Sequence, residues 1–328
     1  MELVEVLLPV LLIVALTATV ASAGNHSSLQ DITTAPPSNC PNSCGNITIK
    51  FPFGIGHGCY RSARFNLTCS DNNSSRLFLG NTTIEVLEID TNQGFMYIKS
   101  LNATLDVADN YKSTSFDLKN LPYSFNLGTN YQFGNYGWTM NNIWHVTGCS
   151  AAAYLIDAAT DTIIDSCSTL CSPTVNLTSG GNCTMHLHNW KAKNRTSLEV
   201  RLVRLNQTYE VDSNMSASSI TAIMYDSYRL TDEELVQELL MQGNIKGELN
   251  ATLVWYVDDD NRTTCAQAKN NTATYACRCS SSDCFDAFPS DEDNKNYIPG
   301  YLCRCSLSYS GNPYEAKGCY LGDISLFF

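Results

Sequence analysis

The sequence predicts a mostly β, disulfide-rich fold made of small stapled modules, with one short helix. The 328 residues contain 15 cysteines in three groups, a density that is typical of exported proteins. Short runs of alternating apolar and polar residues recur along the chain, and such runs are typical of half-buried strands. One segment, residues 231–242, shows a helical pattern with clear end signals.

Residues 1–23 have the features of a cleaved signal peptide. An apolar run from Leu7 to Val20 is short for a membrane span and is followed by Ala21-Ser22-Ala23, a small-x-small cleavage pattern. We therefore expect an extracellular protein. If the run is not cleaved, it would instead tether the protein to a membrane.

The cysteine groups predict three separately stapled modules. Because the total is odd, one thiol is left free or pairs between chains. Zinc binding by the first group is disfavoured, since disulfides are the usual state of cysteines in an exported protein. The groups are Cys40, Cys44, Cys59 and Cys69; Cys149, Cys167, Cys171 and Cys183; and Cys265, Cys277, Cys279, Cys284, Cys303, Cys305 and Cys319.

Asparagines in N-x-S/T sequons support the same compartment. Each sequon that carries a glycan must lie on the surface, because the glycan is bulky and polar. Asn72 overlaps Asn73, so at most one of that pair is used. The expected sites are Asn25, Asn46, Asn66, Asn73, Asn81, Asn102, Asn176, Asn182, Asn194, Asn206, Asn214, Asn250, Asn261 and Asn270.

The first cysteine group encloses the stretch CGNITIKFPFGIGHGC. Apolar and polar residues alternate over 46–53, which predicts a half-buried strand. Pro52 cannot donate to a β ladder, so this strand should lie at an edge or end in a bulge. The glycines of 54–58 allow a tight reversal into Cys59, and residues 65–69 form the expected returning strand.

The remaining elements follow from the same alternation and from end signals. The helix at 231–242 begins at a capping box of Thr231 and Glu234 and ends at Gly243. Trp144, Phe51 and Phe53 are expected in the core. Further strands are predicted at 76–79, 83–89, 95–101, 143–147, 152–156, 197–205 and 249–257.

Several motifs resemble one family. The pattern Cys40-x3-Cys44-Gly45, then FPFGIG-x-GC, then F-x-L-x-C at 65–69, resembles the galacturonan-binding module of plant wall-associated receptor kinases. GCSAAAYLID at 148–157 and CSTLC at 167–171 resemble the next part of those ectodomains. YACRCSSSDC and GYLCRCSLSYSGNPYEAKGC, near the end of the sequence, resemble their EGF-like region. No membrane span or kinase segment follows, so the resemblance implies a short secreted relative or a truncated gene.

The resemblance implies a division into domains. It makes Cys305 and Cys319 an EGF-type pair. It also makes Cys279 the candidate free thiol, because the family more often has a small polar residue there. The expected parts are a signal peptide at 1–23, a Ser/Thr/Pro-rich spacer at 24–39, the galacturonan-binding module at 40–147, a second cysteine-containing β module at 148–262, an EGF-like module at 263–322 and a tail at 323–328.

The resemblance also implies non-catalytic binding of pectic homogalacturonan in the cell wall, and the residues suit that ligand. Arginine and lysine meet carboxylates, and aromatic rings cover the C–H faces of sugars. Arg76 and Lys99 add to the predicted site. The predicted ligand-binding residues are Lys50, His57, Tyr60, Arg61 and Arg64.

The charge of the chain and its motifs argue against several other functions. The net charge is −12, and residues 200–328 hold 10 Lys and Arg against 18 Asp and Glu, which argues against nucleic acid as a partner. His186 and His188 alternate on one strand without a third metal ligand, and Asp258–Asp260 have the pattern of a solvated turn. We expect no enzyme and no cofactor, apart from Ca²⁺ that could bridge acidic groups to pectin. The alternative function is a protein-interaction module or decoy that pairs with full-length wall-associated receptor kinases.

Overall fold

The computed structural model describes 32–70, 75–119, 121–125, 131–133, 136–138, 142–170, 181–186, 196–205, 219–227, 249–258, 264–287 and 300–322. The chain divides into two compact units, Met1–Ile32 and Thr33–Phe328, and all the strands and helices described lie in the second. The predicted signal peptide at 1–23, the helix at 231–242 and the tail at 323–328 lie outside the described residues.

The mostly β, disulfide-rich fold is confirmed. Each of the seven further strands predicted from alternation is present, with bounds that differ by a few residues at most. Two short helical elements were not predicted: the 3₁₀ turn η1 (Ala63–Phe65) and helix α3 (Cys265–Lys269). Helix α3 is too short for an amphipathic period, and a capping box of Thr264 and Gln267 starts it.

The largest sheet is antiparallel and has six strands in the order β3-β4-β5-β6-β18-β9. One of its faces is apolar because alternate residues such as Leu77, Val86 and Ile98 are fully buried. Its strands are β3 (Leu67–Cys69), β4 (Leu77–Leu79), β5 (Glu85–Asp90), β6 (Phe95–Lys99), β18 (Asn250–Trp255) and β9 (Tyr123–Ser124).

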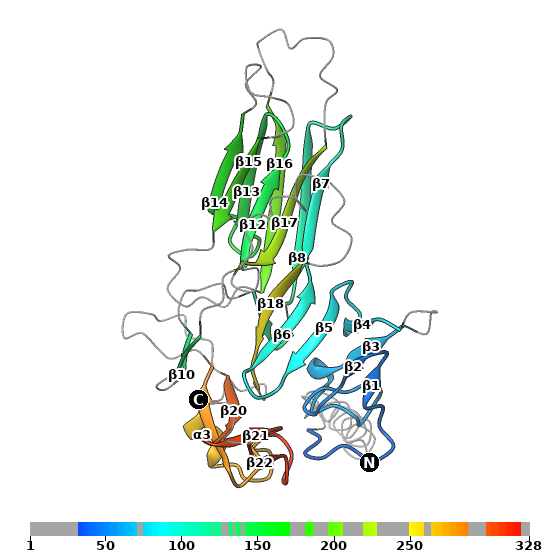
Figure 1. Cartoon of the computed structure of the whole chain (residues 1–328), viewed down its shortest axis with the longest axis vertical. Helices are drawn as coiled ribbons and strands as arrows, with labels where there is room; N and C mark the ends of the chain where they lie inside the picture. The colour runs from blue at the N-terminus through cyan, green and yellow to red at the C-terminus, as the bar shows by residue number, and fades with distance from the viewer. Residues whose placement is uncertain are drawn as a thin grey trace, which may run out of the picture. The chain divides into compact units, whose positions relative to one another are not determined.

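Two four-stranded antiparallel sheets pack against each other as a sandwich, and Figure 1 shows their strands side by side. Leu198, Val200 and Leu202 of one sheet point inward and are buried, and the rings of Phe116 and Trp144 meet across the sheets at 5.5 Å. One sheet has the order β15 (Asn182–His186), β12 (Asn142–Thr147), β17 (Ile220–Asp226), β7 (Leu101–Leu105); the other has β14 (Thr162–Thr169), β13 (Ala151–Asp157), β16 (Ser197–Arg204), β8 (Tyr111–Asp117).

Four two-stranded ribbons complete the described strands. Two belong to the region around the last cysteine group, which we call the C-terminal cysteine region (residues 264–287 and 300–322). The ribbons are β1 (Ser43–Cys44) with β2 (Ile47–Thr48), β10 (Tyr131–Phe133) with β11 (Tyr136–Trp138), β19 (Ser282–Asp286) with β20 (Tyr301–Cys305), and β21 (Tyr309–Gly311) with β22 (Cys319–Leu321).

The boundary predicted between residues 147 and 148 does not divide the sheets. Strands β7 and β8 precede it but pair with β17 and β16, and β18 follows it but pairs with β6 in the six-stranded sheet. Alternation along a strand shows which face is buried but not which strand is its neighbour. The chain therefore returns to its first sheet after it has completed the sandwich.

The six bridges between described cysteines nevertheless each stay within one of the three predicted groups. Cys149 is also disulfide-bonded, Cys171 lies outside the described residues, and Cys279 is a buried free cysteine. The expected Cys305–Cys319 pair is present. The six bridges among the described cysteines are Cys40–Cys59, Cys44–Cys69, Cys167–Cys183, Cys265–Cys284, Cys277–Cys303 and Cys305–Cys319.

Candidate functional site

Residues 40–69, which we call the bridged turn, are held at both ends by disulfides. Cys40–Cys59 and Cys44–Cys69 close loops of 19 and 25 residues in sequence separation. The predicted strand over 46–53 is correct only for Ile47–Thr48, because the chain then turns around Pro52 and the Phe53 amide donates to the Lys50 carbonyl at 3.0 Å. The core prediction for this segment is confirmed: Phe51 is 4% and Phe53 2% exposed.

The glycines of the bridged turn act as predicted, by steric close approach and reversal. A Cβ at Gly54 would lie 2.1 Å from the Cys59 carbonyl oxygen, so no other residue fits there without a backbone shift. Gly56 and Gly58 have φ values of +87° and +81°, in the region that glycine adopts without strain. The Gly54 backbone also pairs with residues 65–67, since the Leu67 amide donates to its carbonyl at 2.8 Å.

Three of the five predicted ligand-binding residues keep an accessible side chain. Lys50 and His57 are exposed, and Tyr60 is half-buried. The neighbours of Lys50 in the chain, Ile49 and Phe51, are both buried.

Arg61 is a correction to the prediction. Its side chain is 1% exposed, and its Nη2 donates a short hydrogen bond to the carbonyl of Thr274 in the C-terminal cysteine region. Its backbone amide donates to Pro52 at 2.9 Å, and its carbonyl accepts from Thr33 at 2.8 Å. The guanidinium therefore joins two parts of the fold and is out of reach of a polymer.

Arg64 is also engaged within the protein. Its Nη1 lies 3.1 Å from Oδ2 and 3.3 Å from the backbone oxygen of Asp258, and the two side chains are 17% and 15% exposed. The expectation that Asp258 belongs to a solvated turn is wrong, because the residue is a partly buried ion-pair partner. Arg64 and Arg61 were both predicted to contact an acidic sugar. Each instead bonds to a residue of the protein itself, 194 and 213 positions away in the chain, respectively.

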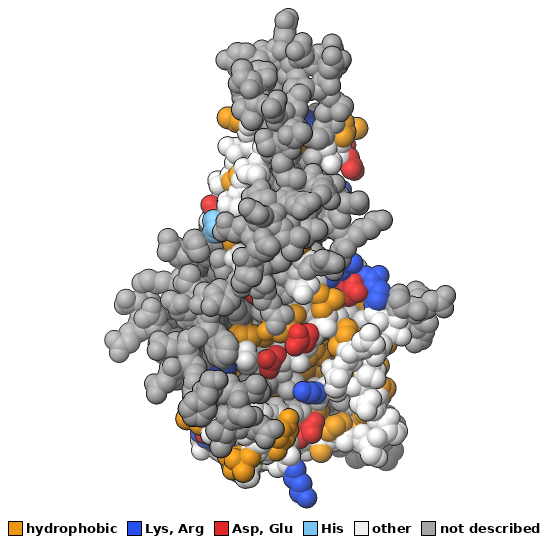
Figure 2. Space-filling model, in the orientation of Figure 1, with side chains coloured by type: hydrophobic (Ala, Val, Ile, Leu, Met, Phe, Trp, Pro, Cys, Tyr) orange, Lys and Arg blue, Asp and Glu red, His pale blue; other side chains and the backbone are white. Residues whose placement is uncertain are grey.

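Arg76 and Lys99 share one carboxylate on the outer face of the six-stranded sheet. Arg76 Nε donates to Glu85 Oε1 at 2.9 Å, and Lys99 Nζ lies 3.7 Å from Glu85 Oε2. Hydrogen bonding from Arg76 lowers the pKa of Glu85. Arg76 also lies over the Phe78 ring at 5.4 Å. Figure 2 shows cationic and acidic side chains intermixed on the visible face rather than segregated into one basic patch.

A cavity of about 660 Å³ opens between the bridged turn and the C-terminal cysteine region; we call it the seam cavity. It has apolar walls, several neutral polar groups and two charged residues, Arg278 and Glu315. Its lining comprises Thr34, Ala35, Pro36, Pro37, Ser38, Cys40, Pro41, Asn42, Ile49, Phe51, Phe53, Cys59, Arg278, Tyr314, Glu315 and Ala316.

Direct contacts hold the two walls of the seam cavity together. The Asn312 amide donates to the Phe51 carbonyl at 2.7 Å and to Glu315 Oε1 at 2.8 Å. The Trp255 ring stands between Phe53 at 4.8 Å and Tyr314 at 5.4 Å. The described part of the predicted spacer forms one wall, so residues 33–39 are packed on the fold rather than separate from it.

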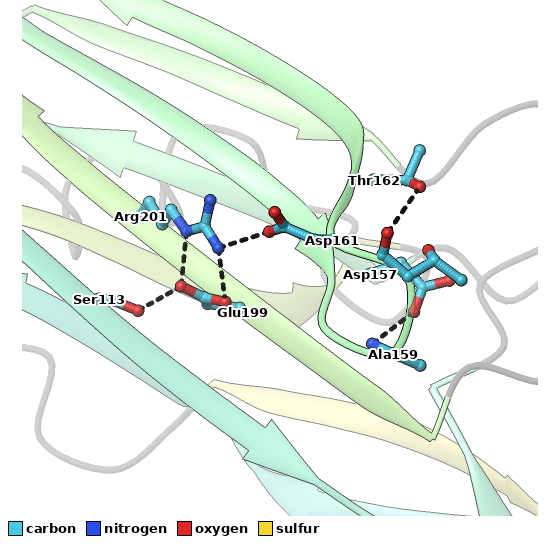
Figure 3. Close-up of polar contacts among 8 residues, drawn as sticks. Ser113, Asp157, Ala159, Asp161, Thr162, Glu199 and Arg201 are labelled. Atoms are coloured by element: carbon cyan, nitrogen blue, oxygen red, sulfur yellow. Dashed lines mark hydrogen bonds and ion pairs between the residues drawn. The ribbon is translucent and has the colours of Figure 1, made fainter.

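The outer face of the sandwich carries a second polar cluster, drawn in Figure 3. Arg201 Nε lies 2.6 Å from Glu199 Oε1, its Nη2 lies 2.7 Å from Asp161 Oδ1, and Ser113 donates to the same Glu199 oxygen. Hydrogen bonding to Arg201 lowers the pKa of Glu199. The single guanidinium of Arg201 is thus shared between two carboxylates, those of Glu199 and Asp161.

The described residues show neither a metal-ligand cluster nor a membrane-spanning helix. Within the described ranges no three His, Cys, Asp or Glu residues gather as metal ligands would. His188 lies outside those ranges, whereas the partly buried His186 bonds to Thr184 Oγ1 at 3.2 Å. Among helices of the described residues, none has the length and apolar character needed to cross a bilayer.

Residues 40–100, which include the whole bridged turn, match the family model described as wall-associated receptor kinase galacturonan-binding. The chain is a relative of the wall-associated receptor kinases. It is 27% identical to wall-associated receptor kinase 3 of Arabidopsis thaliana over 296 residues, which is 87% of this chain and 36% of that protein. It is 26% identical to wall-associated receptor kinase 1 of the same plant over 298 residues, which is 87% of this chain and 34% of that protein. Wall-associated receptor kinase-like 10 is 44% identical over 59 residues, 18% of this chain and 7% of that protein.

This wall-associated receptor kinase relative spans about a third of the length of the first curated relatives that it matches. No solved structure matches it. Sequence reasoning missed Arg278, Asn312 and Glu315 as neighbours of the bridged turn. The GNPY motif containing Asn312 was the available signal, but a motif does not state which distant segment it contacts.

Proposed function

We propose that the chain binds galacturonan, the acidic polysaccharide of pectin, without chemically changing it. The observation that carries the proposal is the match of residues 40–100 to the galacturonan-binding family model. The two disulfides of the bridged turn support it, because a surface that is ordered before binding loses less conformational entropy when it meets a flexible polymer.

The accessible side chains of the bridged turn suit an acidic sugar. Lys50 and His57 are exposed and can donate to carboxylates or hydroxyls, and the half-buried Tyr60 offers an aromatic face. In this proposal Arg61 and Arg64 hold the turn in place and do not touch the ligand.

We further propose that the protein acts in the extracellular space and the cell wall as a secreted glycoprotein whose last region is EGF-like. The predicted signal peptide and the sequons support this location. None of the seven sequon asparagines in the described ranges is buried, as attachment of a glycan requires: Asn46, Asn66, Asn81, Asn102, Asn182, Asn250 and Asn270.

The test is binding of plant-secreted 24–328 protein to an array of pectins that differ in methyl esterification. We expect de-esterified galacturonan to bind best and binding to weaken as salt rises, because the contacts are between opposite charges. Equal binding of esterified and de-esterified polymers would remove the charge-based mechanism, and no binding to either would end the proposal.

A second candidate function is association with a protein partner such as a full-length wall-associated receptor kinase. The observation that favours it is a group of exposed apolar side chains in the C-terminal cysteine region: Leu307 is 72%, Tyr320 63% and Leu321 68% exposed. Co-purification with a receptor ectodomain that is insensitive to salt, and that Leu321→Ser weakens, would support this candidate.

A further inference from the structure

We propose that the seam cavity binds uronic acid residues of the polysaccharide, with Arg278 as the residue that holds their carboxylates. The inference rests on the proposed galacturonan binding and assigns it to a composite site. Its walls come from residues 34–38, from the bridged turn and from the C-terminal cysteine region, and the first and last of these lie outside the matched 40–100 segment.

The shape and lining of the seam cavity suit a sugar acid. Its volume of about 660 Å³ lies within the range of small-molecule sites, which is roughly 300–1,000 Å³. Pro36, Pro37 and Phe51 line it with apolar surface that can cover the C–H face of a sugar ring. Thr34 and Asn42 bring polar groups that can bond to hydroxyls.

Arg278 is positioned for a carboxylate. Its Nη1 donates to the Thr272 carbonyl at 3.2 Å and its Nη2 to the Ala273 carbonyl at 3.1 Å, which fixes the plane of the guanidinium. These bonds use two of the five N–H donors of an arginine side chain. A held guanidinium that retains donors is the arrangement that binds carboxylates through two parallel hydrogen bonds.

Glu315 supplies the complementary group. Its Oε1 is held by the Asn312 amide at 2.8 Å, and the residue lines the cavity. A carboxylate accepts hydrogen bonds from sugar hydroxyls but repels a second carboxylate, so the pair of Arg278 and Glu315 would orient an acidic sugar in one direction. Lys50 is flanked by two lining residues, Ile49 and Phe51, and adds an exposed positive charge beside them.

The burial of Arg61 then has a use in binding. Its contact with Thr274 and the contact of Asn312 with Phe51 hold the two walls in register. A cation that was predicted to touch the ligand thus becomes a positioning residue for the cavity that receives it.

The experiment measures binding of a short de-esterified oligogalacturonide to the full 24–328 chain by titration calorimetry. We expect Arg278→Gln to weaken binding by about tenfold or more, as expected for loss of a charge-assisted contact, and Arg278→Lys to restore part of it. The matched control is Arg204→Gln, since Arg204 also donates to two backbone carbonyls, those of Asp106 and Asp109, but lies on the sandwich. It should bind like the wild type.

Two further variants test the cavity without removing a cation. Ala316 is an exposed lining residue, so Ala316→Trp should fill space and weaken binding while leaving every charge in place. Glu315→Gln should strengthen binding of the de-esterified ligand several-fold and leave that of its methyl ester unchanged, because only the acid is repelled. If Arg278→Gln does not fold, these two variants decide the matter.

The outcomes separate this inference from the function on which it rests. A wild-type chain that binds no oligogalacturonide overturns the proposed function. A wild-type chain that binds it, with Arg278→Gln and Ala316→Trp binding equally well, leaves the function standing and removes the seam cavity as its site.

Discussion

The side-chain amide of Asn312 donates a 2.7 Å hydrogen bond to the backbone carbonyl of Phe51, which lies 261 residues earlier in the chain. Asn312 is 6% and Phe51 4% exposed, so the bond is made away from water. It joins the GNPY segment of the last cysteine group to the FPFG segment of the first. The two most distinctive motifs of the sequence are therefore parts of one local structure.

Asn312→Ala should destabilise the fold by about 1–3 kcal/mol, because the Phe51 carbonyl would be left buried without that donor. Urea unfolding of the purified chain measures the effect. Asn271→Ala, at an exposed position, is the control and should change stability little. An unaltered midpoint for Asn312→Ala would mean that water replaces the amide at no cost.

Substitution of Arg61 should reduce stability, whereas substitution of Lys50 should reduce ligand binding. Arg61→Gln should lower the free energy of unfolding by at least about 1–3 kcal/mol, since the Thr274 carbonyl loses its donor. Lys50→Gln, at an exposed position, should leave stability within about 0.5 kcal/mol but weaken binding of de-esterified pectin. Paired denaturation and binding curves check both statements. The reverse pattern would restore Arg61 as a ligand contact and contradict its burial.

The contrast between Lys50 and Arg61 shows how far sequence reasoning reached. Alternation predicted the positions of the strands because burial on one face has a period of two residues. The cysteine groups predicted that sulfurs pair within a group, but not which sulfur pairs with which. Neither signal carries long-range pairing, so the partners of Arg61, Arg64 and Phe51 could not be found. An arginine in a glycine-rich loop has the same sequence signature whether it meets a ligand or a distant carbonyl.

His145 should make the fold less stable in acid. The residue is 4% exposed on β12, and burial lowers its pKa from the ordinary value of 6.5. Below pH 6.5 the unfolded chain binds a proton that the folded chain takes up only at lower pH, so stability falls as pH drops from 6.5 toward the folded-state pKa. Urea midpoints between pH 7.5 and 5 should therefore decline more for the wild type than for His145→Gln. Parallel declines would assign the acid sensitivity to other groups.

Substitution by alanine should destabilise the protein far more at Gly54 than at Gly56. Gly54→Ala places a methyl group 2.1 Å from the Cys59 carbonyl oxygen, so we expect a severe loss of stability or failure to fold. A Cβ at Gly56 meets nothing within 4 Å, and the penalty there is only that of a positive φ of +87°, about 1–2 kcal/mol. Secretion yield and thermal unfolding of the two variants would show the difference. Equal behaviour would mean that the backbone of the bridged turn can shift away from Cys59.

Cys279 should be the cysteine that reacts only after unfolding. It is 7% exposed, and the Cys319 amide donates to its Sγ at 3.3 Å, so reagents in solvent cannot reach the sulfur in the folded chain. We expect iodoacetamide to leave the Cys279 peptide unmodified in the native protein and to alkylate it in denaturant without reductant, as read by peptide mass spectrometry. The bridged cysteines, such as Cys277 and Cys303, should stay unlabelled under both conditions.

Cys279→Ser should retain the Cys305–Cys319 bridge next to it, because that bridge does not use the Cys279 sulfur. A Cys279 that resists alkylation even when unfolded would show that it is paired, and the bridge pattern of the last cysteine group would then have to be redrawn.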